Sequence, residues 1–279
     1  MTTTLSYQSP SLAPSRHATV RVAGALRSEW TKLRSVRSTT WTILTLAVIT
    51  LGIAAIAGSS VTSSWHKMST VDRLTFDPTQ LSLRGMLFGQ LVIGVLGILV
   101  MSAEYSTGSI RSTLMAVPSR SKVMLTKIAI MAVVGFVVSE VLSFGAFFLG
   151  QALLASPAPH ATLSQPGVLR AVMGGGLVLT VLGLVALGLA TIIRHSAAAI
   201  TTYVGVLLVL PLVVQALPTS ISQPITKYLP FHISDAMTSV THVLGSGPSL
   251  SPWTGFAVLC GYAVVALAVA MWMLVRRDA

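Results

Sequence analysis

Charge is what this chain has least of. Only 9% of its 279 residues are Asp, Glu, Lys or Arg, whereas 53% are hydrophobic and the mean hydropathy is +0.81. Soluble domains carry about 25% charged residues, so this chain cannot cover a soluble surface. The composition therefore predicts an all-α integral membrane protein.

Acidic residues are scarcer still. There are 7 Asp and Glu against 18 Lys and Arg, which gives a formal net charge of +11. In a soluble protein such an excess would indicate a nucleic-acid partner. Here the basic residues flank long apolar runs, so membrane lipids and membrane orientation explain them better. We expect no nucleic-acid partner.

Several chemical motifs are also missing. The single cysteine, Cys260, excludes an internal disulfide, and its apolar surroundings predict a small buried side chain. The sequence has no G-x-x-x-x-G-K-[ST] motif, so the chain cannot hold a nucleotide by a P-loop, and it has no C-x-x-C, H-E-x-x-H or G-x-S-x-G motif. His160, His232 and His242 have no ligand-like spacing. We therefore expect no catalytic residue, metal site or cofactor on this chain.

Six apolar runs approach the roughly 20 residues that a helix needs to cross the hydrocarbon core. They are Trp41–Gly58, Met86–Ala103, Ile128–Ala155, Ala171–Ile193, Ala197–Leu217 and Trp253–Val275. The third is longer than a span requires, and Pro211 is expected to kink the fifth. The outer loop 218–252 is expected to hold two short helices, near Ile221–Leu229 and His232–Leu244.

Six spans place both termini on one side of the membrane. Thirteen Lys and Arg lie in the segments on that side and five on the opposite side, which predicts cytoplasmic termini. Residues 1–19, rich in Ser, Thr and Pro, are expected to be a disordered cytoplasmic tail. Residues 20–279 then form a single transmembrane domain whose first span is retained, because no clear cleavage site follows it.

The segment Val20–Val36 is predicted to be an amphipathic helix in the inner headgroup layer. Val22, Leu26, Trp30 and Leu33 form one apolar stripe, with Trp30 as the anchor, and Arg21, Arg27, Lys32 and Arg34 fall on the other face. The helix is expected to end or bend near Ser38. It is either a topological anchor or makes a specific contact, which the lone acid Glu29 favours. The candidate residues are Glu29, Trp30, Lys32, Leu33 and Arg34.

The stretch between the second and third spans is the most informative. After Glu104 and Tyr105, Gly108 permits a tight backbone turn. Ile110, Leu114 and Val117 then form one side of a short helix that Pro118 ends, and Arg120 and Lys122 return the chain to the inner surface. A short helix with an apolar edge and charged ends is suited to dock in a groove on a partner.

This stretch resembles the loop after the second span of ATP-binding-cassette (ABC) type-2 exporter permeases. The shared elements are Glu104-Tyr105, Gly108-Ser109-Ile110-Arg111, Leu114 and Pro118-Ser119-Arg120. The segment Ser28-Glu-Trp-Thr-Lys-Leu-Arg-Ser-Val-Arg-Ser-Thr-Thr-Trp41 is similar to the start of bacterial members. The resemblance covers most of the chain in layout and about thirty residues in motif.

The resemblance implies a bacterial plasma-membrane permease that pairs with an identical or related chain above two ATPase subunits. ATP and Mg would then bind to the ATPases. The ATPase-coupling residues would be Glu104, Tyr105, Gly108, Ile110, Arg111, Leu114, Pro118 and Arg120, with Glu104 and Arg111 supplying charge and Ile110 and Leu114 supplying apolar contact. The cargo would be a hydrophobic or amphipathic compound, such as a drug, antibiotic, peptide or lipid-like molecule.

One carboxylate, Glu140, lies well inside a predicted span, about 18 Å along the helix from Ile128. A charge at that depth is costly and indicates function: it could face the translocation path, bind a cationic substrate or carry a proton. The alternative is a protonated carboxyl that is hydrogen-bonded to Ser139, Ser143 or a neighbouring helix. Gln90, Gln151 and Gln215 are expected to join helices by hydrogen bonds.

Three other functions remain open. A proton-coupled secondary transporter would use Glu140 and need no ATPase. A membrane enzyme is disfavoured because no acid, base and nucleophile converge at one depth. A membrane anchor for a signalling ATPase would bind the same partner and transport nothing.

Overall fold

The computed structural model describes residues 22–106, 108, 120–154, 156, 158–241 and 249–276. Every regular element in these ranges is helical. The expected tail, residues 1–19, lies outside the described residues. We refer to residues 104–120, which are predicted to dock on a partner, as the docking segment. Most of it also lies outside the described residues, including Ile110, Arg111, Leu114 and Pro118. Their predicted properties therefore stay predictions.

Within the described ranges, six helical segments are long and apolar enough to cross a membrane, as the sequence predicted. They are α2 (Arg37–Ser64), α4 (Pro78–Ser106), α6 (Arg120–Leu153), α7 (Val168–Ile193), the fifth span and α12 (Pro252–Arg276). The fifth span consists of α8 (Ser196–Val204), a π-helical turn (Gly205–Val209) and α9 (Leu210–Gln215). Helices α2, α4 and α6 begin earlier than predicted, because polar residues extend each helix beyond its apolar run.

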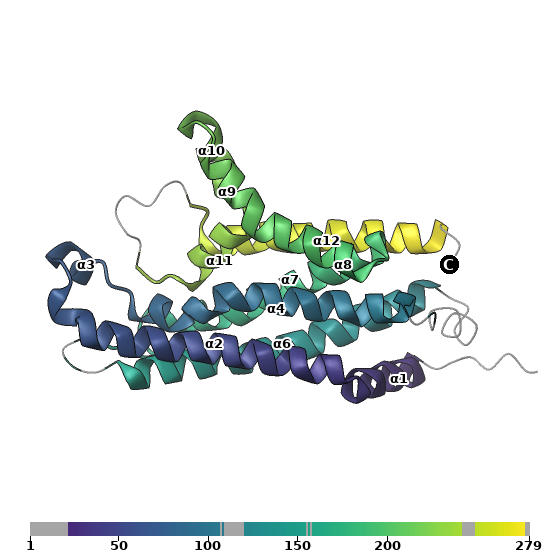
Figure 1. Ribbon diagram of the computed structural model, residues 1–279, viewed down its shortest axis with the longest axis horizontal. Coiled ribbons are helices and arrows are strands. Elements are labelled where there is room, and N and C mark those ends of the chain that lie inside the picture. The colour runs from purple at the N-terminus through teal and green to yellow at the C-terminus, as the bar shows by residue number, and fades with distance from the viewer. Residues whose placement is uncertain are drawn as a thin grey trace, which may run out of the picture.

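Helices α2, α4, α6 and α7 form a bundle along the long axis of the molecule, and α12 packs on α7 (Figure 1). Close packing here depends on glycine. A Cβ at Gly85 would lie 2.2 Å from the carbonyl oxygen of Thr50, and one at Gly97 would lie 2.2 Å from that of Gly183. These glycines let α4 approach α2 and α7.

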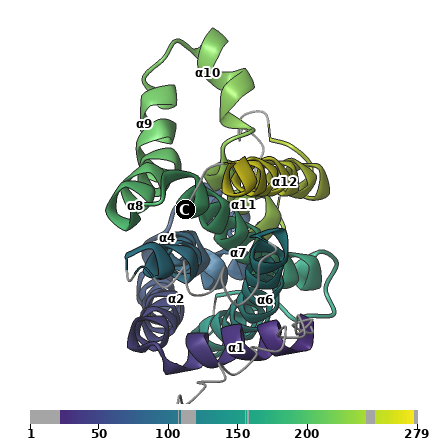
Figure 2. The same ribbon diagram turned by 90° about the vertical axis from the view of Figure 1, so that its right-hand side faces the viewer.

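The fifth span leaves the bundle part-way along. Helix α8 packs against α4 and α7, whereas α9 and the short helix α10 (Thr219–Thr226) project away from the other spans (Figures 1 and 2). The π-helical turn ends at Val209, two residues before Pro211. Proline has no N–H for the usual bond to the carbonyl four residues earlier. The helix widens to a π-helical turn ahead of Pro211, where the sequence predicted a kink.

The end of the bundle that carries α3 (Thr70–Leu74) is tied together by polar side chains. The buried Asp77 accepts hydrogen bonds from Thr79 N, Gln80 N, Val240 N and Thr241 N and so joins α4 to the segment after α11 (Pro230–Thr238). At the same end, Arg170 donates to the carbonyls of Met237 and Ser239, at 3.0 and 2.8 Å.

Two of the three glutamines that were predicted to join helices, Gln90 and Gln151, make such hydrogen bonds. Gln90 Nε2 donates to Ser234 Oγ at 3.0 Å, and Gln151 Nε2 donates to Pro78 O and Ser82 Oγ. Gln215 is exposed and makes no such bridge among the described residues. The predicted helices in the last outer loop correspond to α10 and α11.

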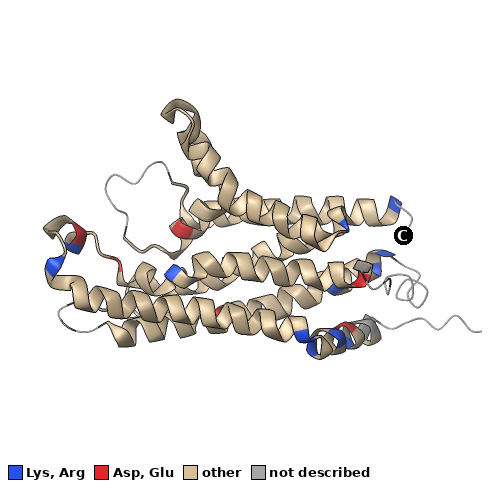
Figure 3. Cartoon of the chain, viewed as in Figure 1, with Lys and Arg blue, Asp and Glu red and all other residues tan. Residues whose placement is uncertain are grey.

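The opposite end carries the end of α12 and α1 (Val22–Ser35), which packs on α6 and α2 (Figures 1 and 2). Helix α1 stops before the predicted Ser38, because Val36 adopts an extended backbone with φ −82° and ψ 115°. Charged residues gather mainly at the two ends of the molecule (Figure 3). The placement of α1 in a headgroup layer remains a prediction.

Candidate functional site: a buried charge cluster

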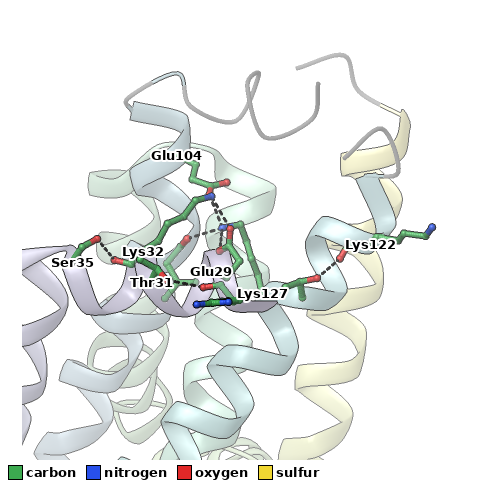
Figure 4. A network of polar contacts seen from close by, with 10 residues as sticks. Glu29, Thr31, Lys32, Ser35, Glu104, Lys122 and Lys127 are labelled. Atoms are coloured by element: carbon green, nitrogen blue, oxygen red, sulfur yellow. Dashed lines mark hydrogen bonds and ion pairs between the residues drawn. The ribbon is translucent and has the colours of Figure 1, made fainter. Parts of the chain in front are cut away.

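Four charged side chains from three helices meet at the α1 end of the bundle. Glu29 and Lys32 come from α1, Glu104 from the last turns of α4, and Lys127 from the third turn of α6 (Figure 4). We refer to these four residues as the charge cluster. They join segments that lie almost a hundred residues apart in the sequence.

Lys127 is the centre of the charge cluster. Its side chain is 1% exposed, and its ammonium lies 2.8 Å from Glu29 Oε2 and 2.9 Å from Glu104 Oε1. The third contact is with the carbonyl oxygen of Val100, at 3.5 Å. An ammonium has three N–H donors, so Lys127 has one acceptor for each of them.

Lys32 closes the charge cluster from the side nearer to solvent. Its Nζ lies 2.7 Å from both Glu29 Oε1 and Glu104 Oε1, and its side chain is 43% exposed. Glu29 precedes Lys32 by three residues, which places both on one face of α1. The two carboxylates and two ammonium groups balance, so the charge cluster has no net charge.

The charge cluster shifts the pKa values of its α1 members. Burial alone would raise the pKa of Glu29, but the attraction of Lys127 and the hydrogen bonds from Lys127 and Lys32 outweigh it and lower that pKa. Burial alone would lower the pKa of Lys32, but hydrogen bonds to Glu104 and Glu29 raise it. Both groups therefore stay charged at neutral pH.

Sequence patterns identified three members of the charge cluster but not their meeting. Glu29, Lys32 and Glu104 were candidates in two separate motifs, and Lys127 was counted only as a basic residue on the inner side. Its signal was its position inside the apolar start of a span, where an unpaired lysine would be costly. On α1, Leu33 is half-buried near the charge cluster, while Trp30 (53% exposed) and Arg34 are exposed.

The two ends of the docking segment are both anchored in the bundle. Glu104 is only 6% exposed and bonded within the chain, which favours an internal role over direct contact with a partner. The guanidinium of Arg194 lies over the Tyr105 ring, 5.6 Å from its centroid. At the other end, Arg120 donates to the carbonyl of Leu274 in α12 at 3.0 Å. Gly108 has φ +68°, a left-handed conformation that suits glycine.

Glu140 lies between α6 and α7, away from the charge cluster. Both of its carboxyl oxygens are buried and accept no hydrogen bond from any described residue. The bonds to Ser139 and Ser143 that one alternative included are absent: Ser143 donates to the carbonyl of Val172, and Ser139 Oγ has no partner in the described part of the chain. A Cβ at Gly176 would lie 2.6 Å from Glu140 Cδ, so this glycine leaves the carboxyl its space.

No group of three or more His, Cys, Asp or Glu side chains that could hold a metal ion occurs among the described residues. His195 is the N-cap residue of α8, and its Nδ1 accepts a hydrogen bond from Ala198 N at 3.4 Å.

Comparison with protein families decides the class of this chain. A family model described as ABC-2 family transporter protein matches residues 25–211, about two thirds of the sequence. The chain belongs to the ABC-2 transporter family. The part of this ABC-2 permease that matches contains the charge cluster, the docking segment and Glu140, and it ends before α10. A comparison with curated proteins gives no match.

Proposed function

We propose that this ABC-2 permease is the membrane subunit of an ATP-driven exporter, and that a separate ATPase docks on residues 104–120. The charge cluster is the observation that carries the proposal. It ties Glu104, at the start of the docking segment, to α1 and α6, while Arg120, at its end, bonds to α12. A push on the segment would therefore reach four helices directly.

The proposed complex contains two permease chains, identical or related, and two ATPases that bind ATP and Mg. The termini and the charge cluster face the cytoplasm of a bacterium, in line with the excess of Lys and Arg in the segments on that side. Helix α1 lies in the inner headgroup layer, where Trp30 contacts membrane lipids.

A hydrophobic or amphipathic compound is the proposed cargo. An apolar cavity of about 360 Å³ supports this class, and its lining residues come from α7, α9, α10 and α12 among other segments. Leu182, Val206, Leu259 and Tyr262 are among its lining residues. Multidrug efflux is one form that such transport could take.

Co-purification tests the docking proposal. The tagged chain is expressed with its candidate ATPase and purified in mild detergent with Mg-ATP. Arg111→Ala/Leu114→Ala removes one charge and one apolar contact from the docking segment, and we expect it to reduce the bound ATPase several-fold. The matched control, Arg73→Ala/Leu74→Ala, makes the same change at exposed positions at the α3 end. Equal retention of the ATPase by both variants would contradict the proposed docking site.

Glu140 supports a second candidate, a proton-coupled secondary transporter. An ionised carboxylate without a partner is costly within a span, and Glu140 has no hydrogen-bond partner among the described residues. This function requires uptake or efflux that depends on a pH gradient, persists without any ATPase and is lost in Glu140→Gln. Transport that needs ATP and survives Glu140→Gln would exclude it.

A further inference from the structure

A second polar cavity, of about 240 Å³, lies between α2, α4 and α11 and shares no residue with the charge cluster. Its polar lining residues are Gln80 and Arg84 from α4 and Asp235 and Thr238 from α11. Leu87 and Phe88 of α4 are among its apolar lining residues. The cavity therefore presents a cation, an anion and an apolar surface to whatever occupies it.

The two opposite charges on this lining are not paired. Arg84 is exposed and makes no hydrogen bond or ion pair within the described part of the chain. The carboxylate of Asp235 accepts one hydrogen bond from the described residues, from Gln80 Nε2 at 2.9 Å. A carboxylate offers about four acceptor positions. Both charges are therefore available to a ligand.

No cation of the protein neutralises Asp235. His232 lies one turn earlier in α11, and it would balance this charge only in its protonated form. Burial lowers the pKa of His232 and outweighs the attraction of Asp235. The imidazole is therefore mainly neutral at pH 7, and the carboxylate keeps its negative charge.

The polar groups from the two helices differ in their hydrogen-bonding character. On α11, Thr238 Oγ1 donates its proton to Ser234 O at 3.0 Å. Its hydroxyl oxygen and the Asp235 carboxylate can therefore only accept from a ligand. On α4, the guanidinium of Arg84 can only donate. A ligand that complements both helices carries a cationic donor and an anionic acceptor close together.

The apolar part of the lining continues from Arg84 along α4. Arg84 lies about 9 Å from the start of this helix at Pro78, in a segment that is long and apolar enough to cross a membrane. An arginine near the end of a span reaches the headgroup layer. Phe88, four residues further on the same face of α4, is 53% exposed. The polar groups are thus followed by an exposed apolar surface for acyl chains.

We propose that this cavity binds the headgroup of phosphatidylethanolamine, a zwitterionic phospholipid. The phosphate would accept hydrogen bonds from Arg84, and the primary ammonium would donate to the Asp235 carboxylate and Thr238 Oγ1. The acyl chains would leave the cavity over Leu87 and Phe88. Pockets for drug-sized ligands measure about 300–1,000 Å³, so the smaller cavity here suits a headgroup. In the orientation proposed above the lipid comes from the outer leaflet, but the site itself depends on neither export nor an ATPase.

Native mass spectrometry of the delipidated full-length chain tests the ammonium contact. Phosphatidylethanolamine and phosphatidylglycerol with identical acyl chains compete for the first bound site. Wild type should prefer phosphatidylethanolamine by about tenfold, because phosphatidylglycerol has no ammonium for Asp235. Asp235→Asn should abolish the preference, since the amide oxygen still accepts from Gln80 but the charge is gone. Asp72→Asn, at an exposed acid in α3, is the matched control and should keep it.

A second pair of variants tests the phosphate contact. Arg84→Gln should weaken the binding of both lipids by about tenfold, because each of them carries the phosphate. Lys67→Gln, which removes another exposed cation, is its matched control and should bind as wild type does. Thermal unfolding without lipid checks that all variants are folded. The ratio of the two lipids within one variant does not depend on how much of the protein is folded.

Soluble phosphoethanolamine distinguishes a lipid from a free zwitterion with the same polar groups. At millimolar concentration it should not displace the bound lipid, because it has no acyl chains to cover Leu87 and Phe88, and displacement would overturn the lipid assignment. Equal binding of both lipids by wild type, or a preference that persists in Asp235→Asn, would overturn the site. Equal lipid binding by Arg84→Gln and Lys67→Gln would also overturn it. None of these readouts requires transport, so they are independent of the proposed function.

Discussion

Replacing Lys127 by Met should destabilise the protein strongly. Met is close to Lys in length but has no charge, so Glu29 and Glu104 would keep only Lys32 as a partner, and the charge cluster would acquire a net negative charge. Removing one partner from a buried ion pair typically costs about 3–5 kcal/mol. For a domain of this size, about 2 °C of Tm corresponds to 1 kcal/mol, so we expect Tm to fall by roughly 6–10 °C.

Thermal unfolding in detergent, followed by intrinsic tryptophan fluorescence, measures this change. Lys122→Met is the matched control, because Lys122 is exposed, lies five residues earlier in α6 and makes no ion pair within the described residues. Its Tm should stay within about 1 °C of wild type. Lys127→Met/Glu29→Gln restores neutrality, so it should recover at least half of the loss. Equal Tm values for Lys127→Met and Lys122→Met, or strict additivity in the double variant, would refute the reasoning.

The deficit of Lys127→Met should also depend on pH in a defined way. The pKa of Glu29 is lowered from 4.5, so its contribution to stability is present above pH 4.5 and is lost as the pH falls through its folded pKa. The pKa of Lys32 is raised from 10.5, so its contribution is present below that pH and is lost above the folded pKa. The Tm difference should therefore be constant between roughly pH 6 and 9 and should shrink in stronger acid.

Three other substitutions test the rest of the structure. Asp77→Asn, which weakens the bonds that join α4 to the segment after α11, should cost about 2–3 kcal/mol in thermal unfolding, whereas Asp72→Asn at an exposed site should cost little. Gly97→Ala brings a methyl group against the Gly183 carbonyl and should destabilise by about 1–3 kcal/mol or more, whereas Gly52→Ala, with nothing within 4 Å, should not. Glu140→Gln should leave Tm and ATP-dependent transport nearly unchanged, because a neutral amide fits the same space; loss of ATP-dependent transport would show that the carboxyl takes part in it.

The six spans could be predicted from the sequence, because a helix that crosses a membrane needs about 20 mainly apolar residues. Met86–Ala103 and Trp253–Val275 are apolar enough to have no soluble alternative, and both lie within helices of the structure. The predicted ends of α2 and α4 were wrong, because Ser, Thr and Arg residues extend both helices beyond the apolar runs on which the prediction rested. The π-helical turn ahead of Pro211 has no residue pattern that distinguishes it from a simple kink.

For the charge cluster, sequence patterns predicted individual residues but not the contacts between them. Sequence patterns predicted Glu29, Lys32 and Glu104 as candidate functional residues. Glu29 is a lone acid among bases, Lys32 lies on the charged face of the same helix, and Glu104 is an acid at the end of a span. Their meeting with Lys127 depends on how α1 crosses the bundle, which no local pattern specifies. The bonds of Arg170 could not be predicted for the same reason, because its acceptors, Met237 O and Ser239 O, are backbone groups almost seventy residues away.

Coupling through the charge cluster is the central claim, and one measurement tests it most directly. The permease–ATPase complex is reconstituted in liposomes, and ATP hydrolysis is measured per bound ATPase for wild type, Glu29→Gln/Lys127→Met and the control Lys122→Met. We predict that the double variant retains its ATPase but hydrolyses ATP at a rate that differs several-fold from that of wild type and the control, because Glu104 loses its bond to α6 and keeps only Lys32 of α1 as a partner. The same rate in all three complexes would contradict the claim.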